Sequence, residues 1–325
     1  MSFRRKLDLI GLYATSLLQN RRNAEFFNGI QTYCMFVGYP RTGHSLIGSL
    51  LDAHPRVVIA HELNALRFFY WGFSRRQVFH LLLENSRKMA TKGRSHSGYS
   101  YSVPNQWQGR FEQLQVLGDK SGQASARGFH FHPDLRDFLR NKIAIDLKFI
   151  HVIRNPYDVL ATMSRRSPHK ALDKHIDRFF QLCSGVGRLK NRNQDLHIYD
   201  LRLESFIEDP KSGLAGLCSF LGIKAEASYL EDCASIVFPS PKKSRFDIEW
   251  SREGIAKVRE RMEAIDFLSG YGYEEEETGP AATQGARPKK SLEILTTGKW
   301  QLSMAASTMV HEMLTGFPVL CSILT

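Results

Sequence analysis

The sequence predicts an α/β fold of the P-loop-NTPase type, in which helices cover both faces of a parallel sheet. Short apolar runs of strand length alternate with segments of helical periodicity between residues 33 and 275. One run passes through a glycine-containing turn directly into a helix (36–50, FVGYPRTGHSLIGSL), an order typical of phosphate-binding folds. A chain of 325 residues, 42% of them hydrophobic, can form one such domain or two smaller ones.

Five apolar runs are the predicted strands, and helical patterns or turns connect them. Leu46, Ile47 and Leu50 recur at helical spacing after the first glycine-containing turn. A later helix begins at Pro156, a favoured first position, with Asn155 as its N-cap. The predicted strands are 34–38, 57–60, 115–118, 147–153 and 196–201, the other predicted helices are 63–92, 156–166, 174–193, 211–222 and 252–269, and 93–113 is a predicted loop.

Composition changes divide the chain into four predicted parts. Residues 1–32 form an amphipathic leader helix without a clear signal-peptide pattern, and 33–275 form the α/β domain. The stretch 276–299 has the composition of a flexible linker. The apolar tail 300–325 is too interrupted to span a bilayer, so it is either a docking or interfacial segment or a tail without a function. These termini are compatible with a peripheral membrane contact.

The charge and the cysteines limit the function classes. A net charge of +11 favours an anionic ligand such as a nucleotide, a sulfated polymer, a nucleic acid or a membrane surface, although a basic soluble protein has the same balance. The five cysteines form no CxxC pair, which argues against a zinc site and a disulfide framework. A reducing compartment, the cytoplasm, is therefore expected.

The first turn is suited to hold a phosphate. Gly38, Gly43 and Ser45 have the spacing of the GxxxxGK[ST] loop, but His44 occupies the position of its lysine. The cation of this turn is Arg41 instead. The unpaired N–H groups of the following helix attract an anion. Without the lysine that binds a γ-phosphate, the turn suggests a nucleotide whose chemistry is not γ-phosphoryl transfer.

A second strand-to-helix unit carries another candidate anion site. Arg154 ends an apolar run, the helix after it begins at Pro156, and Thr162 lies two turns further on. A guanidinium can bind a phosphate through two parallel hydrogen bonds. The alternative is that Arg154 pairs with a carboxylate such as Asp158. Two anion sites on separate units suit a nucleotide that is phosphorylated at both ends.

Together the two units resemble the signatures of sulfotransferases that use 3′-phosphoadenosine 5′-phosphosulfate (PAPS) and release 3′-phosphoadenosine 5′-phosphate (PAP). The loop 40–45 is similar to the family's P-[KR]-[ST]-G-x-[ST], and 154–162 is similar to its Arg-Asn-Pro-x-Asp segment with a later hydroxyl. In motif style the chain is most similar to the Golgi-type, tyrosylprotein and bacterial enzymes. The resemblance extends over 33–275 and includes LLDAHPRVVIAHE (50–62) and VLGDKSG (116–122). It implies the sulfotransferase fold, PAPS as donor and no metal.

The resemblance also assigns catalytic roles. By family spacing, Glu62 is the general base, with His61 as second choice, although Glu62 could instead pair with Arg67. Lys120 would hold the sulfuryl oxygens, or else pair with Asp119 in an ordinary turn.

The remaining implied residues bind the donor. Arg41 would also act in catalysis, because it would stabilise charge on the leaving phosphate. Arg245 lies in a basic loop that could close over the 3′-phosphate. The cofactor-binding residues are Pro40, Arg41, Thr42, Gly43, His44, Ser45, Arg154, Thr162 and Arg245.

The acceptor is expected to bear a hydroxyl on a carbohydrate, a phenol or tyrosine, or a lipid, and not to be a nucleic acid. Tyr99, Tyr101 and Trp107 are candidate acceptor contacts because aromatic faces suit rings. Two other function classes stay open: a nucleotide kinase or NTPase with Asp119 as the magnesium-linked acid, and a non-catalytic binder of nucleotides or anionic polymers. The sequence leaves the oligomeric state open.

Overall fold

The computed structural model describes residues 3–19, 23–96, 98–132, 134–191 and 196–274. The predicted linker and the predicted apolar tail lie outside these residues. The compact unit that contains the described residues ends at Glu274.

A five-stranded parallel sheet forms the centre of this unit, as the sequence predicted. The strand order is β2-β5-β1-β6-β7, and every neighbouring pair runs parallel. All six residues of the central strand β1 are buried, because helices cover both faces. The strands are β1 (Thr32–Val37), β2 (Val57–Ala60), β5 (Val116–Asp119), β6 (Asp146–Ile153) and β7 (His197–Arg202).

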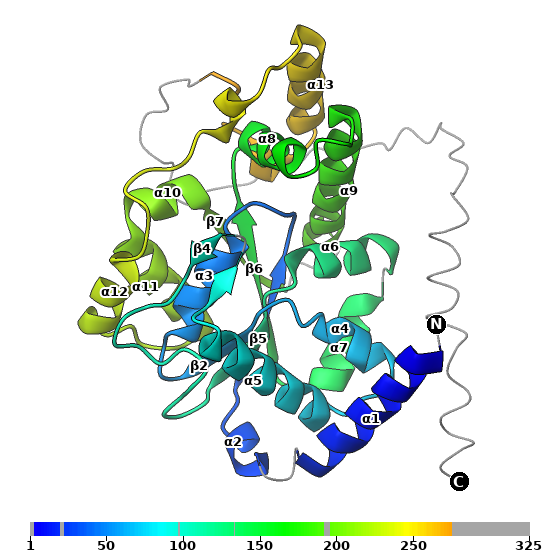
Figure 1. Ribbon diagram of the computed structural model, residues 1–325, viewed down its shortest axis with the longest axis vertical. Coiled ribbons are helices and arrows are strands. Elements are labelled where there is room, and N and C mark those ends of the chain that lie inside the picture. Colours follow the sequence, from blue (N-terminus) through cyan, green and yellow to red (C-terminus); the bar gives the residue numbers. More distant parts are fainter. Residues whose placement is uncertain (1–2, 20–22, 97, 133, 192–195, 275–325) are drawn as a thin grey trace. The chain divides into compact units, whose positions relative to one another are not determined.

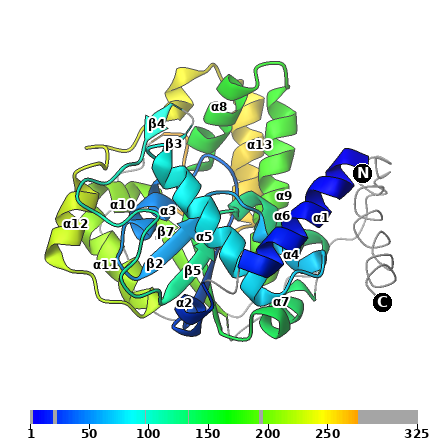
Figure 2. The same cartoon turned by 60° about the horizontal axis from the view of Figure 1, so that its bottom comes forward.

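Helices pack on the two faces of the sheet. On the first face, alternate residues of the strands, such as Cys34 and Ile150, share a core with leucines of the helices. On the second face, Tyr33 stacks on Phe79 at 5.9 Å. In Figure 1, α11 and α12 lie to the left of the sheet and α6 and α9 to its right, and Figure 2 shows the same separation. The first-face helices are α3 (His44–Asp52), α10 (Leu203–Glu208), α11 (Pro210–Leu221) and α12 (Ala227–Ala234), and the second-face helices are α4 (Ala65–Tyr70), α5 (Arg75–Thr91), α6 (Gly122–Phe131) and α9 (Leu172–Asn191).

Two parts of the secondary structure differ from the prediction. The predicted helix 63–92 is divided into α4 and α5, since Gly72 has a φ of 79° and Ser74 starts a new helix through a capping box with Gln77. The predicted loop 93–113 contains a two-stranded antiparallel hairpin, β3 (Ser95–His96) and β4 (Tyr99–Ser100). Strands of two residues are too short to show periodicity, so these two strands could not be predicted.

The N-terminal segment forms α1 (Phe3–Gln19), which packs on α5. Gln77 Nε2 donates to Tyr13 O and to Ser16 Oγ at 3.1 Å each. Among the described residues, no helix is both long enough and apolar enough to cross a membrane. The other helical segments are α2 (Ala24–Asn28), α7 (Leu135–Ile143), α8 (Pro156–Arg166), η1 (Ser244–Asp247), α13 (Arg252–Glu263) and η2 (Asp266–Leu268).

The strand order places the predicted site residues along one edge of the sheet. The phosphate-type turn follows β1, and Glu62, Lys120 and Arg154 follow β2, β5 and β6. Because the strands are parallel, their carboxyl ends lie at the same edge, where ligands of open α/β sheets bind.

Candidate active site

The turn between β1 and α3 has the backbone of an anion cradle. Gly43, the N-cap of α3, has a φ of 89°, and a Cβ there would lie 2.6 Å from Leu203 Cδ1. Arg41 also has a positive φ, 70°, which costs a non-glycine residue about 1–2 kcal/mol. Among the described residues no side chain caps α3, so the N–H groups of its first turn can bind an anion.

The His44 side chain turns into the core, although its backbone belongs to the cradle. A Cβ on Gly38 would lie 3.2 Å from His44 Cε1, and a Cβ on Gly122 only 2.8 Å from it, so the ring fills the space between two glycines. Its Nδ1 lies 3.0 Å from Thr42 Oγ1. Burial, followed by the nearby Lys120 charge, lowers the pKa of His44 to about 3. The ring is neutral and does not replace the missing lysine as a cation.

Lys120 links the cradle to Glu62. Its side chain is 3% exposed, and its Nζ donates to Ser45 Oγ at 3.0 Å and to Glu62 Oε1 at 2.9 Å. Burial raises the pKa of Glu62, but the charge and hydrogen bond of Lys120, with His61 and His96, outweigh it and bring that pKa below its ordinary value. The Glu62 carboxylate is therefore ionised at neutral pH and remains 59% exposed toward the cavity.

The turn that carries Glu62 is fixed by the buried Asp119. The Asp119 carboxylate accepts hydrogen bonds from the backbone N–H groups of Leu63 at 3.2 Å and of Ala65 at 2.7 Å. Ser121 Oγ donates to the same carboxylate at 3.0 Å. Burial raises the pKa of Asp119 to about 6, against the effect of these hydrogen bonds. Asp119 thus supports the turn and does not pair with Lys120.

Arg154 leaves the end of β6 and joins two loops. Its Nη1 donates to Arg41 O at 3.0 Å, and its Nη2 donates to Lys242 O at 2.6 Å and lies 3.3 Å from Ser244 Oγ. Thr162 Oγ1 on α8 faces the same region and donates to a backbone carbonyl at 2.8 Å.

Arg245, by contrast, lies in a buried ion pair. Its Nη1 donates to Asp158 Oδ2 at 2.7 Å, its backbone N donates to Asp158 Oδ1, and its Nε donates to Tyr273 O at 2.8 Å. The residue is only 4% exposed. The alternative partner of Arg154, Asp158, is therefore occupied by Arg245.

A cavity of about 1050 Å³ brings most of the predicted site residues together. Of the predicted residues, Thr42, His61 and Arg245 are not among the described residues that line it. Trp107 is also elsewhere, beside a separate cavity of about 430 Å³. The predicted site residues in the lining are Pro40, Arg41, Gly43, His44, Ser45, Glu62, Lys120, Arg154 and Thr162.

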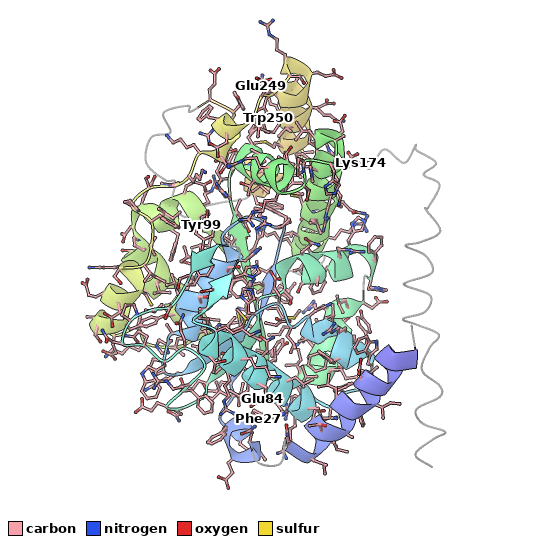
Figure 3. All side chains as sticks on the ribbon, viewed as in Figure 1. Phe27, Glu84, Tyr99, Lys174, Glu249 and Trp250 are labelled. Atoms are coloured by element: carbon pink, nitrogen blue, oxygen red, sulfur yellow. The ribbon has the colours of Figure 1, made fainter. Side chains whose placement is uncertain are left out.

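Aromatic residues form another part of this lining. Tyr99 of β4, which is labelled in Figure 3, contacts Phe238 edge to face at 5.9 Å and Tyr101 at 6.2 Å. Tyr99 and Tyr101 were predicted acceptor contacts. Phe238 and His96 were not predicted, because their places depend on the hairpin and on a loop after α12, for which the sequence has no local signal.

The chain is similar to several solved structures at low sequence identity. No curated protein sequence matches the chain. Among solved structures, the sulfotransferase domain of the Synechococcus PCC 7002 olefin synthase is 13% identical, with a TM-score of 0.47 over 73% of this chain and 94% of that one. The sulfotransferase domain of the curacin biosynthetic pathway is 14% identical, with a TM-score of 0.46 over 72% and 96%. A sulfotransferase from Mycobacterium avium is 11% identical, with a TM-score of 0.46 over 77% and 81%.

A family model described as "Sulfotransferase family" matches residues 35–227, a range that holds the cradle, Glu62, Lys120 and Arg154. The match covers more than half of the chain and confirms the predicted family and enzyme class. The chain belongs to the sulfotransferase family.

Proposed function

We propose that this enzyme transfers a sulfuryl group from PAPS to a hydroxyl acceptor by in-line displacement, with Glu62 as general base. One observation carries the proposal: Lys120 Nζ contacts both Ser45 of the anion cradle and the Glu62 carboxylate. This contact supports Glu62 as a proton acceptor beside the position at which the cradle would hold a phosphosulfate.

The donor would be held at its two charged ends. The N–H groups at the start of α3, with Arg41 and the Ser45 hydroxyl, would bind the 5′-phosphosulfate. Arg154 and Thr162 would bind the 3′-phosphate. Arg154 now donates hydrogen bonds to backbone carbonyls and would donate to a phosphate oxygen in place of one of them. Arg245 is better suited to support this side of the cavity through Asp158 than to contact the donor directly.

The positions of these side chains support one transfer step. The acceptor oxygen would attack sulfur and form the new S–O bond, the bridging S–O bond to the 5′-phosphate would break, and Glu62 would take the proton of the acceptor hydroxyl. Lys120 would move from Glu62 onto the sulfuryl oxygens, and Arg41 would stabilise the charge that develops on the leaving phosphate. The scheme needs no metal ion, because these two cations supply the positive charge.

The aromatic wall supports an acceptor with a ring near its hydroxyl. Tyr99 and Phe238 are 43% and 53% exposed and offer apolar faces in the cavity that Glu62 also lines. Such faces stack on sugar rings and on phenols. A carbohydrate or phenolic acceptor is therefore favoured over a flexible lipid chain.

The orientation of Asp119 argues against the kinase alternative. A magnesium-linked Asp119 would have to face the nucleotide, but its carboxylate binds the backbone of the 63–65 turn. The described residues that line the cavity include Lys120 and not Asp119.

Calorimetry with PAP and with ATP·Mg tests the donor. We expect micromolar binding of PAP, weak binding of ATP·Mg, and loss of PAP binding in Arg154→Ala but not in Arg140→Ala, an exposed arginine on α7. Preference for ATP·Mg, or equal effects of the two variants, would refute the proposal.

Transfer of labelled sulfate onto panels of sugars, phenols, peptides and lipids tests the reaction and its acceptor. Glu62→Gln should reduce turnover by about a hundredfold or more and leave PAP affinity unchanged. Turnover that does not depend on Glu62 would exclude it as the base.

A further inference from the structure

Two histidines meet at the catalytic carboxylate. His61 and Glu62 follow β2, whereas His96 comes from the hairpin strand β3. One ligand atom from each of the three side chains lies within 4.8 Å of the other two. The rings of His61 and His96 lie 4.6 Å apart, centroid to centroid. Donor atoms from two separate segments therefore converge on one point.

This cluster contains a nitrogen without a partner. His61 Nε2 is buried and has no hydrogen-bond partner among the described residues. Most buried polar atoms in native proteins are paired, so an unpaired ring nitrogen beside two other donor groups indicates a missing ligand. The backbone of His61 cannot relax easily, since its N–H donates to Asn85 Oδ1 at 2.7 Å.

The donor set identifies the class of that ligand. Two imidazole nitrogens with one carboxylate oxygen are typical of zinc sites that keep an open position, whereas Mg²⁺ and Ca²⁺ prefer oxygen ligands. The Glu62 carboxylate is 59% exposed, which gives an ion a path from the cavity to the cluster.

We propose that His61, Glu62 and His96 form a binding site for a divalent transition metal of the zinc class, and that its occupation inhibits the enzyme. The inhibitory part rests on the proposed function, because a metal ion bound to Glu62 would occupy the carboxylate that takes the proton from the acceptor hydroxyl. The three side chains donate lone pairs to the ion, and no oxidation state changes. A water or acceptor oxygen completes the ligand shell.

The positive charge of Lys120 limits the affinity of this site. Its Nζ lies 2.9 Å from Glu62 Oε1, so an incoming cation must share Glu62 with it or displace it. Lys120 retains Ser45 Oγ at 3.0 Å as a second partner, which permits displacement. We therefore expect a dissociation constant in the micromolar range, weaker than that of structural zinc sites.

Metal titration of the full chain tests the site without any assay of activity. The chelator-treated protein is titrated with ZnCl2 in competition with a chromophoric chelator, and with CoCl2 while visible absorption is recorded. We expect one equivalent to bind, and His96→Ala and His61→Ala to weaken binding by at least about tenfold. His197 is an exposed histidine at the start of β7, so His197→Ala is the matched control and should bind zinc as the unmodified chain does. His96→Gln and thermal unfolding of every variant exclude loss of folding as the cause.

The outcomes separate this inference from the proposed function. One equivalent of zinc that depends on His96 supports the site even if no sulfuryl transfer is found. Zinc inhibition of sulfate transfer that His96→Ala relieves supports the inhibitory part. No stoichiometric binding, equal binding in His96→Ala, or equal affinity for MgCl2 overturns the site, whether or not the enzyme transfers sulfate. Undiminished transfer with the site filled overturns the inhibition.

Discussion

Lys120 Nζ donates a hydrogen bond to Glu62 Oε1 at 2.9 Å, although the two residues lie 58 positions apart in the chain. The strand order explains this contact, because β2 and β5 are neighbours and each residue follows the end of its strand. The lysine is buried and the carboxylate is exposed, so the ion pair is open toward the cavity. In the proposed reaction the two groups act in sequence: Lys120 must leave Glu62 before Glu62 can become a stronger base.

This relationship predicts that the effects of Lys120→Met and Glu62→Gln on turnover are not multiplicative. Each single variant should lower kcat by about 10²–10⁴-fold, because one removes the sulfuryl contact and the other removes the base. The double variant should lose less than the product of the two effects, since each residue depends on its partner. Sulfate transfer under single-turnover conditions measures this coupling.

Lys174→Met, which changes an exposed lysine at the start of α9 (Figure 3), is the control and should leave kcat unchanged. Independent, fully multiplicative effects of the two substitutions would contradict the proposed exchange of Lys120 between Glu62 and the sulfuryl group.

A second prediction separates Arg245 from Arg154. Arg245→Ala leaves the buried carboxylate of Asp158 unpaired, which should lower the free energy of unfolding by about 3–5 kcal/mol. Arg154→Ala should lower the affinity for PAP more than it lowers stability, because the Arg154 side chain lies on the cavity. Urea unfolding and calorimetry with PAP measure the two quantities for each variant. A stable Arg245→Ala protein that fails to bind PAP would restore Arg245 as a donor contact.

Much of the fold could be predicted because its strands are continuous apolar runs between clear turns. The central strand β1 is buried on both sides, so its sequence TYCMFV carries no alternation but a strong overall hydrophobicity. The hairpin β3–β4 could not be predicted, since it has two residues per strand and no apolar pattern. This missed prediction matters for function, because the hairpin brings His96 and Tyr99 to the cavity.

The candidate site was predictable to the extent that its residues follow strand ends. Arg41, Glu62, Lys120 and Arg154 each come directly after a strand or in the turn that follows it, and parallel strands bring such positions together. The partner of Arg245 was not predictable in the same way. Whether a cation in a loop faces a ligand or a buried carboxylate depends on packing between elements far apart in the chain.

A third prediction concerns the glycine that faces His44. A Cβ on Gly122 would lie 2.8 Å from His44 Cε1, and the ring cannot move freely because it is buried against the cradle. Gly122→Ala should therefore lower the free energy of unfolding by about 1–3 kcal/mol. In a His44→Ala background the same substitution should cost nothing, since the space of the ring is then empty.

Urea unfolding of the two single variants and the double variant measures this effect. Gly187→Ala is the matched control, because no heavy atom lies within 4 Å of a Cβ at this helical position. It should be neutral or stabilising by about 0.5–1 kcal/mol. An equal cost of Gly122→Ala in both backgrounds would show that His44 is not the residue it meets.

The last prediction concerns pH and Asp119. Its pKa is about 6 in the folded chain, against an ordinary value of 3.8, because burial opposes its ionisation. Between these two values the folded state binds more protons than the unfolded state, so this group lowers stability as the pH rises from about 4 to about 6 and has no further effect above that. The total change is at most about 3 kcal/mol. Asp119→Asn cannot ionise, so the stability of the unmodified chain minus that of Asp119→Asn should fall across this range and then level off. Urea unfolding at pH 4 to 8 measures the difference, with exposed Asp137→Asn as control. A constant difference would mean that Asp119 titrates in the folded chain as it does in water, and that its burial does not raise its pKa.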